Sequence, residues 1–255
     1  MVEQATENRC VGGSIPPLGT TDMSFFRLTP FIILFFALGC DIGSNNLFPF
    51  KEGKIWSYSI NLFSSYTGQN SEKRILITNA QTKKIKNGYE VTRLHSDGNF
   101  FTYQIDKKKN KITRVSAFLV NQEGLIEPVK KDVYPDLDFK KKKWVVMEQL
   151  FLIKGFQPPL ENFKPQIKFE MNYFLAHEYK KFKYNGRVFS DCFYLIGNGS
   201  TSFIADTRSG PIDVDVKSEE WICRGIGILK QVRTEDTEAS AFGKMSFTKE
   251  LIFFK

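Results

Sequence analysis

The stretch Ile55–Leu62 reads IWSYSINL, and its pattern decides the fold class that we expect. Trp56, Tyr58, Ile60 and Leu62 alternate with small polar residues along this stretch. A repeat of two residues is typical of a β-strand that buries one face and exposes the other. The stretch therefore predicts a strand whose aromatic and aliphatic side chains face the core of a β-sheet.

Similar strands are predicted along the rest of the chain, separated by short polar turns. Asn87-Gly88 and Asn185-Gly186 are expected to close hairpins, because glycine adopts positive φ at little cost. Gly197-Asn198-Gly199 is interpreted as a further turn. The expected strands lie at 55–62, 73–78, 89–95, 99–105, 112–120, 167–182, 187–196, 200–205, 218–223, 226–232 and 241–254. This meander predicts an all-β fold, a curved antiparallel sheet or half-barrel of about ten strands.

Residues 121–166 interrupt the regular pattern and are predicted to form an irregular insert. Five prolines occur in this segment, which also carries a run of four lysines. Residues 144–154 are mainly apolar and long enough for a strand or a short helix, and we favour a strand with an adjoining loop. An insert of this length in a β domain often caps an opening or carries a contact surface.

A short apolar segment precedes the expected domain. Residues 31–38 are wholly apolar, Arg27 lies before them, and Gly39 and Cys40 follow. A positive residue, an apolar stretch and a small residue before the cut are the parts of a secretory signal. The stretch is far shorter than the roughly 20 residues that a helix needs to cross a bilayer, which disfavours a spanning anchor.

Ala37-Leu38-Gly39-Cys40 resembles the lipobox of bacterial lipoproteins, in which the first residue is usually Leu. The resemblance implies that the signal is cleaved between Gly39 and Cys40 and that the Cys40 thiol carries a lipid. It also implies a lipid-anchored location in the bacterial cell envelope. Asp41 favours the inner membrane facing the periplasm, with the outer membrane as the alternative. An ordinary secretory signal with an incidental cysteine is the competing interpretation.

These features divide the chain into four expected parts. Residues 1–22 are polar and slightly acidic, unlike the start of a signal, and we interpret them as a mis-assigned extension before Met23. Residues 23–39 form the signal peptide, and residues 40–46 form a polar tether. Residues 47–255 form a single β domain that contains the insert. The 42 % hydrophobic content of the chain is sufficient for a core of that size.

Two cysteines remain after the expected cleavage, Cys192 and Cys223. An even pair in an exported domain is a candidate disulfide, with two buried, unpaired thiols as the alternative. A metal site is not expected, because the chain has two histidines, His95 and His177, and neither lies near a cysteine in sequence. No cofactor is expected either.

The formal charge of +8 reflects several lysine runs. Candidate residues for contact with an anionic membrane surface are Lys107, Lys108, Lys109, Lys140, Lys141, Lys142 and Lys143. The alternative is that these lysines are solvated strand ends that prevent pairing between sheet edges. The envelope location disfavours nucleic acid as a partner.

Three further motifs resemble a group of uncharacterised secreted bacterial β-proteins. Phe48-Pro49-Phe50, Gly53 and Trp56-Ser57-Tyr58 match the group's FPL-x-x-G-x-x-W-x-Y opening. Asp191-Cys192 and the stretch 225–230 match two later features, whereas Cys223-Arg224 departs from the group's pattern. The resemblance implies a curved antiparallel sheet like the half-barrels of LolA/LolB-type lipoprotein carriers. It implies no reaction.

No catalytic signature occurs in the sequence, and we expect a protein that is not an enzyme. The expected function is to bind an apolar ligand, such as a lipid, or an envelope protein partner. The alternative is a structural or interaction lipoprotein with no small ligand. An enzyme is the less favoured interpretation, and it requires polar groups that converge around His95 or His177. The shape of the concave face of the sheet, hollow and apolar or packed, distinguishes these functions.

Overall fold

The computed structural model describes residues 46–120, 125–127, 131–134, 139–156, 158–208 and 210–255. The predicted extension, the signal peptide, the lipobox with Cys40 and most of the tether lie outside the described residues. Residues 40–255 form one compact unit. No helix among the described residues is long and apolar enough to cross a membrane.

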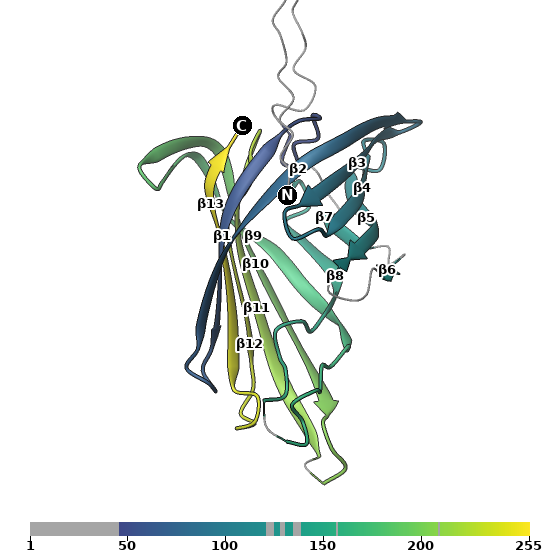
Figure 1. The fold of residues 1–255 in the computed structure, drawn as a ribbon. Coiled ribbons are helices and arrows are strands. Elements are labelled where there is room, and N and C mark those ends of the chain that lie inside the picture. Colours follow the sequence, from purple (N-terminus) through teal and green to yellow (C-terminus); the bar gives the residue numbers. More distant parts are fainter. Residues whose placement is uncertain (1–45, 121–124, 128–130, 135–138, 157, 209) are drawn as a thin grey trace, which may run out of the picture. The chain divides into compact units, whose positions relative to one another are not determined.

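The described residues form an all-β structure of thirteen strands in one antiparallel sheet (Figure 1). The strands are β1 Ile55–Ser64, β2 Asn70–Ile85, β3 Gly88–His95, β4 Phe100–Asp106, β5 Lys111–Leu119, β6 Leu125–Glu127, β7 Lys131–Tyr134, β8 Lys143–Gln149, β9 Lys168–Tyr184, β10 Arg187–Ile204, β11 Pro211–Cys223, β12 Gly227–Asp236 and β13 Lys244–Phe254. Twelve of them follow the order β6-β5-β4-β3-β2-β1-β13-β12-β11-β10-β9-β8, and β7 pairs with β5.

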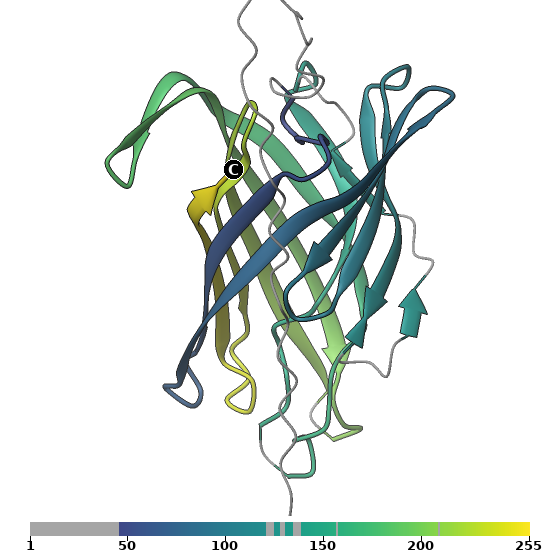
Figure 2. The ribbon, with the colours of Figure 1, turned by 45° about the horizontal axis from the view of Figure 1, so that its top comes forward.

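The sheet curves so that its two ends approach each other, which Figure 2 shows from a second side. β7 contacts β8 across the gap between the ends of the strand order. Three aromatic rings line this seam: Tyr134 on β7 packs edge-on against Phe139 at 5.6 Å, and Phe139 stacks on Trp144 of β8 at 5.5 Å. The sheet is therefore a nearly closed barrel, which is more closed than the predicted half-barrel.

The predicted turn at Gly197-Asn198-Gly199 is wrong, because all three residues lie within β10. Gly197 pairs directly with Tyr173 of β9, and a Cβ on Gly197 would lie 2.6 Å from the Tyr173 ring. A Cβ on Gly199 would lie 2.6 Å from the sulfur of Met171. These glycines make room for large inward side chains rather than for a turn. The predicted strands 187–196 and 200–205 are consequently one strand.

The insert also contains more regular structure than predicted. Two short strands, β6 and β7, add to the expected count of about ten. The apolar segment 144–154 is a strand followed by a loop, as predicted, since β8 ends at Gln149. Leu150, Leu152 and Ile153 then continue into the core and are almost fully buried.

A buried carboxylate holds this loop inside the sheet. Glu235 on β12 is fully buried and accepts hydrogen bonds from the backbone N–H groups of residues 151, 152 and 153, at 3.1, 2.9 and 2.8 Å. Glu235 also accepts bonds from Arg233 Nε and Nη2, at 3.1 and 3.0 Å. The insert therefore occupies the interior, where it fills part of the space that the sheet encloses.

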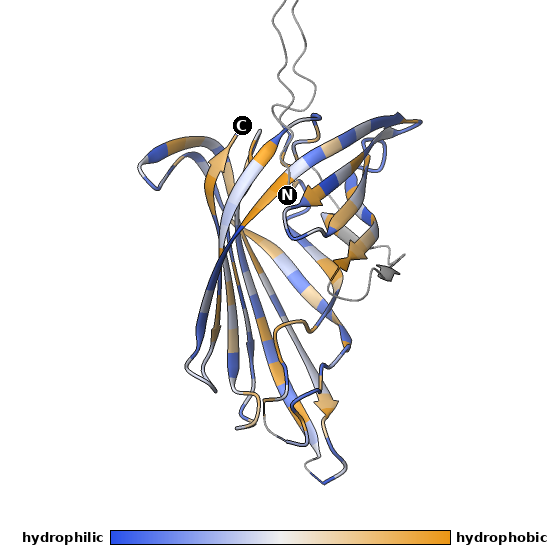
Figure 3. Cartoon of the chain, viewed as in Figure 1, coloured by the Kyte–Doolittle hydropathy of each residue, from blue (hydrophilic) through white to orange (hydrophobic). Residues whose placement is uncertain are grey.

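Hydrophobic and hydrophilic residues alternate along several strands, as the colours of Figure 3 show. The registers place Tyr58 opposite both Ile75 and Leu251, so that all three side chains share the inner face. The disulfide between Cys192 and Cys223 is present and joins two directly paired positions of β10 and β11. Its sequence separation of 31 residues corresponds to about 3 kcal/mol of stabilisation through loss of unfolded-state entropy.

The close approach of Gly197 and Tyr173 predicts that alanine destabilises the protein at position 197 but not at the neighbouring position 198. Gly197→Ala should lower the free energy of unfolding by about 1–3 kcal/mol, because the added methyl group collides with a ring that is stacked on Trp144. Asn198→Ala is the control, since its side chain is exposed on the opposite face. Urea unfolding of both variants checks this. Equal effects of the two substitutions would contradict the packing role of Gly197.

Candidate functional site

Two adjacent cavities lie inside the curved sheet. We name the first, of about 110 Å³, the Arg93 cavity, and the second, of about 260 Å³, the Arg233 cavity. The residues that line both are Tyr103, Val133, Tyr134, Ile228 and Lys249. Further residues of the Arg93 cavity include Leu47, Phe48, Trp56, Tyr58, Ile77 and His95. The interior is thus neither a large apolar hollow nor fully packed.

Arg93 on β3 is the cation of the Arg93 cavity. Its Nε donates to Asn79 Oδ1 at 2.9 Å, and its Nη2 donates to the backbone oxygen of Pro49 at 2.9 Å. Its guanidinium lies over the ring of Phe48, 3.6 Å from the centroid. Both hydrogen-bond acceptors are neutral groups, so these contacts position Arg93 without balancing its charge.

Lys249 on β13 lines both cavities and is half-buried. Within the described part of the chain, its ammonium group lies over the ring of Tyr58 at 4.2 Å and forms no hydrogen bond or ion pair. Burial, reinforced by the charge of Arg93, lowers the pKa of Lys249 to about 8, while Glu220 acts in the opposite direction. Lys249 is therefore a cation for which the attraction of Glu220 does not offset the effects of burial and of Arg93.

Tyrosine side chains form much of the cavity walls. Tyr58 donates to the backbone oxygen of Ile228 at 3.0 Å, and Tyr134 donates to Glu220 Oε2 at 3.0 Å. Burial raises the pKa of Tyr58, and it raises the pKa of Tyr134 further together with the charge of Glu220. These hydroxyl groups thus remain neutral donors at ordinary pH.

The Arg233 cavity contains an ion-paired group and two unused donors. Arg233 pairs with Glu235 at 3.0 Å and approaches Glu148 at 3.5 Å. By contrast, two buried nitrogen atoms on its wall have no hydrogen-bond partner among the described residues, namely Arg114 Nε and Trp144 Nε1. A buried donor without a partner is costly, and an acceptor placed in this cavity relieves that cost.

The two histidines occupy unrelated positions. His95 faces the Arg93 cavity and packs against Phe101 with 4.8 Å between ring centroids, and burial together with the charge of Lys249 lowers its pKa to about 4. His177 is exposed on β9, beside Tyr179 at 4.3 Å. Five strands separate β3 from β10, the neighbour of β9, so the structure does not bring the two histidines together.

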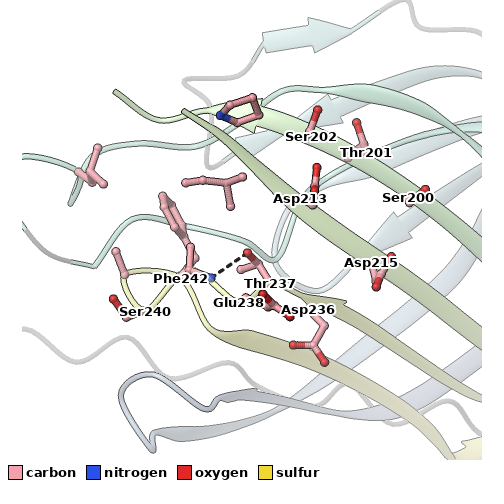
Figure 4. Close-up of a pocket in the computed structure, with 15 residues that line it drawn as sticks. Ser200, Thr201, Ser202, Asp213, Asp215, Asp236, Thr237, Glu238, Ser240 and Phe242 are labelled. Carbon is pink, nitrogen blue, oxygen red and sulfur yellow. Dashed lines mark hydrogen bonds between the residues drawn. The ribbon is translucent and has the colours of Figure 1, made fainter. Parts of the chain in front are cut away.

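An open recess of about 1250 Å³ lies where β10 and β12 end and β11 begins (Figure 4). Hydroxyl groups and carboxylates line it, among them Ser200, Thr201, Asp213, Asp215 and Asp236. No group of three or more metal-ligating side chains occurs in the part of the chain that the structure describes. The recess is wide and solvent-exposed, and its carboxylates point to no particular ligand.

The predicted lysine runs lie at the opposite end of the sheet from this recess. Lys107–Lys109 form the β4–β5 turn, and Lys107 lies over the ring of Phe50 at 5.7 Å. Lys140–Lys143 lead into β8 directly after Phe139, which contacts Phe193 at 5.4 Å. Arg224 in the β11–β12 turn lies over that same Phe193 ring, also at 5.4 Å. Both runs are exposed.

Sequence reasoning missed Arg93, Arg114, Arg233 and Lys249 as interior residues. The signal was present in the alternation of the strands, since Lys249 occupies the same face as Phe247 and Leu251. Charged residues are rarely buried unless they are paired, so a lysine on an otherwise apolar strand face marks a position of interest. The alternation alone does not reveal which opposing strand completes the site.

The lowered pKa of Lys249 predicts how stability depends on pH. Between about pH 8 and the ordinary value of 10.5, the unfolded chain holds a proton that the folded chain has released. Raising the pH from about 7.5 to about 10 should therefore increase the free energy of unfolding by about 1–3 kcal/mol relative to Lys249→Met. Urea unfolding at both pH values checks this. The same pH dependence in wild type and variant would contradict a lowered pKa of Lys249.

Comparisons with known proteins give only remote likenesses. No family model matches the sequence, and no curated protein matches it. A "putative lipoprotein" from Parabacteroides distasonis has 11% identity and a TM-score of 0.38, covering 83% of this chain and 99% of its own. A "putative exported protein with YmcC-like fold" from Bacteroides fragilis has 12% identity and a TM-score of 0.36, with the same coverage. A "putative outer membrane lipoprotein-sorting protein domain" from Vibrio parahaemolyticus has 12% identity and a TM-score of 0.26, covering 80% of this chain and 85% of its own. At these values we draw no conclusion from the likenesses.

Proposed function

We propose that this chain is a lipid-anchored protein of the bacterial envelope that is not an enzyme and binds a ligand inside its β domain. In this proposal the Cys40 thiol carries the lipid, and Asp41 directs the protein to the inner membrane. The observation that supports the membrane orientation is the position of Lys107, which lies over the ring of Phe50, close in sequence to the tether. The backbone oxygen of Asn46 accepts a hydrogen bond from Gly225, in the turn that also carries Arg224.

A lipid at Cys40 places the lysine-rich end against the bilayer. The tether of residues 40–46 is short, so the end of the domain that holds Asn46 lies nearest to the anchor. Lysines close to an anionic leaflet contribute about 1 kcal/mol each. We define the membrane-facing set as Lys107, Lys108, Lys109, Lys140, Lys141, Lys142 and Lys143. The opposite end, with the acidic recess, then faces away from the bilayer.

The interior cavities support the ligand-binding part of the proposal. Their combined walls include aromatic rings, aliphatic side chains and a small number of charged groups, which is the usual composition of a small-molecule site. His95 and His177 lie on strands that the strand order keeps apart, so no single site uses both histidines. The competing proposal is that the domain binds an envelope protein on its surface and no small ligand in its interior.

Lipidation is tested directly on the full chain expressed in a bacterial host. Wild-type protein should incorporate an alkyne-labelled fatty acid and lose residues 1–39, whereas Cys40→Ser should do neither, because the acylated atom is the Cys40 sulfur. Intact-mass spectrometry and in-gel detection of the label give the measurement. An unlabelled wild-type chain that retains residues 1–39 would refute the anchor.

Membrane orientation is tested with residues 41–255, produced without the signal and lipid. Changing Lys140–Lys143 to Gln should weaken binding to phosphatidylglycerol vesicles at least tenfold at low salt, because each lysine contributes up to about 1 kcal/mol. The matched control changes four lysines elsewhere in the domain, Lys154, Lys164, Lys168 and Lys244, to Gln. Vesicle co-sedimentation measures both. If the two quadruple variants lose affinity equally, the orientation is wrong.

A further inference from the structure

The charges inside the sheet are not balanced. Four cationic side chains face the two cavities within the described residues, Arg93, Arg114, Arg233 and Lys249. Three carboxylates accompany them, from Glu148, Glu220 and the adjacent Glu235. Interior charges are normally paired, since an uncompensated charge in an enclosed site is costly. One additional negative charge would balance this interior.

Each of the three carboxylates has polar partners, and those of Glu235 and Glu148 include a cation, Arg233. Glu235 is committed to Arg233 and to the backbone of residues 151–153. Glu220 accepts from Tyr134 at 3.0 Å and from Gln231 Nε2 at 3.1 Å. Lys249 lies over the Tyr58 ring and forms no hydrogen bond or ion pair among the described residues, although the charge of Glu220 acts on it as well as that of Arg93. The imbalance is therefore located at Lys249 and its neighbour Arg93, both of which line the Arg93 cavity.

Two buried donors without a hydrogen-bond partner also favour a negatively charged ligand. Arg114 Nε and Trp144 Nε1 are buried donors on the wall of the Arg233 cavity, which Lys249 also lines. Lysine, arginine and tryptophan nitrogens donate hydrogen bonds and accept none at ordinary pH. A site that offers donors and excess positive charge is complementary to an acceptor-rich anion, and not to a purely apolar ligand.

We infer that the two cavities form one site for a small organic acid with a single negative charge, whose carboxylate binds Lys249 and Arg93. The inference rests on the proposed ligand-binding function and specifies the ligand class. The 110 Å³ of the Arg93 cavity accommodates a carboxylate group, and the 260 Å³ of the Arg233 cavity accommodates a compact body. A phospholipid with two acyl chains is too large for these volumes.

The walls favour an aromatic or short aliphatic body. Trp144 and Tyr173 stack with 5.9 Å between their centroids, and both line the Arg233 cavity. Val146, Phe151 and Ile228 complete the apolar surface of the same cavity. Because the Arg93 cavity is bounded by Leu47, Phe48 and Pro49, it lies toward the lysine-rich end of the domain. Lysines at that end raise the local concentration of anions.

The test uses benzoate and benzamide, two probes of nearly equal size that differ in charge. The mature lipoprotein is purified in a neutral detergent, and the dissociation constants are measured by saturation-transfer NMR. Benzoate should bind more tightly than benzamide to the wild-type protein. In Lys249→Met, the affinity for benzoate should fall about tenfold or more, whereas the affinity for benzamide should stay the same. Lys249 makes no hydrogen bond that folding depends on, so the variant is expected to fold.

Lys244→Met is the matched control, since it removes the same charge from the same strand at an exposed position. Its affinity for benzoate should equal that of the wild-type protein. A pH series adds a second readout, because loss of the Lys249 proton near pH 8 should weaken benzoate binding in the wild type and not in Lys249→Met. The other titratable or charged groups that line the two cavities with Lys249 are Arg93, His95, Glu220, Tyr58, Tyr103, Tyr134, Arg114, Glu148, Tyr173 and Arg233. Burial raises the pKa of each of these tyrosines, and the pKa of His95 is about 4, so none of them explains a change near pH 8.

Three results would overturn the inference: no benzoate binding, equal affinity for benzoate and benzamide, or an unchanged benzoate affinity in Lys249→Met. Lipid attachment at Cys40 and vesicle binding are measured on the same wild-type preparation. If these two properties are present and benzoate fails to bind, the anion site is wrong and the membrane part of the proposed function stands. If benzoate binds as expected but the chain carries no lipid, the anion site stands and the membrane part of the proposed function is wrong.

Discussion

The carboxylate of Glu235 is the constraint on which the interior depends. It is fully buried, and it holds three consecutive backbone N–H groups of the insert together with the guanidinium of Arg233. Removing one partner of such a group leaves a buried charge uncompensated, at a cost of about 3–5 kcal/mol. The insert is therefore part of the core, and Arg233 becomes part of a cavity wall instead of a surface residue.

The same constraint explains why the inside of the sheet is polar at its centre. With Arg233 and Glu235 inside, two groups of β8 also face the interior. Arg233 Nη1 lies 3.5 Å from Glu148 Oε2, and Arg233 Nη2 donates to the backbone oxygen of Gln149 at 3.0 Å. Large rings cannot then fill the whole space, although Gly197 and Gly199 let Tyr173 and Met171 lie close to β10. The result is a core with two small hollows between apolar ends, instead of a continuous apolar channel.

Much of the architecture was predictable from local sequence, and the site was not. Alternation at Ile55–Leu62 and the Asn-Gly hairpins identified strands correctly, because both signals act between near neighbours. Gly197 was misinterpreted because the reason for it, the Tyr173 ring, lies on another strand. Arg93 and Lys249 were missed for the same kind of reason, since β3 and β13 are brought to one cavity only when the sheet closes. Pairing between distant segments is not encoded in periodicity.

The pairing of β1 with β13 has a consequence for biogenesis. Trp56 at the beginning of the domain lies opposite Phe254, near its last residue, in a ladder of nine paired positions. Until β13 has been synthesised, β1 has an open hydrogen-bonding edge, and the curved sheet is interrupted at that point. A chain of this topology therefore cannot complete its fold before β13 is available to pair with β1.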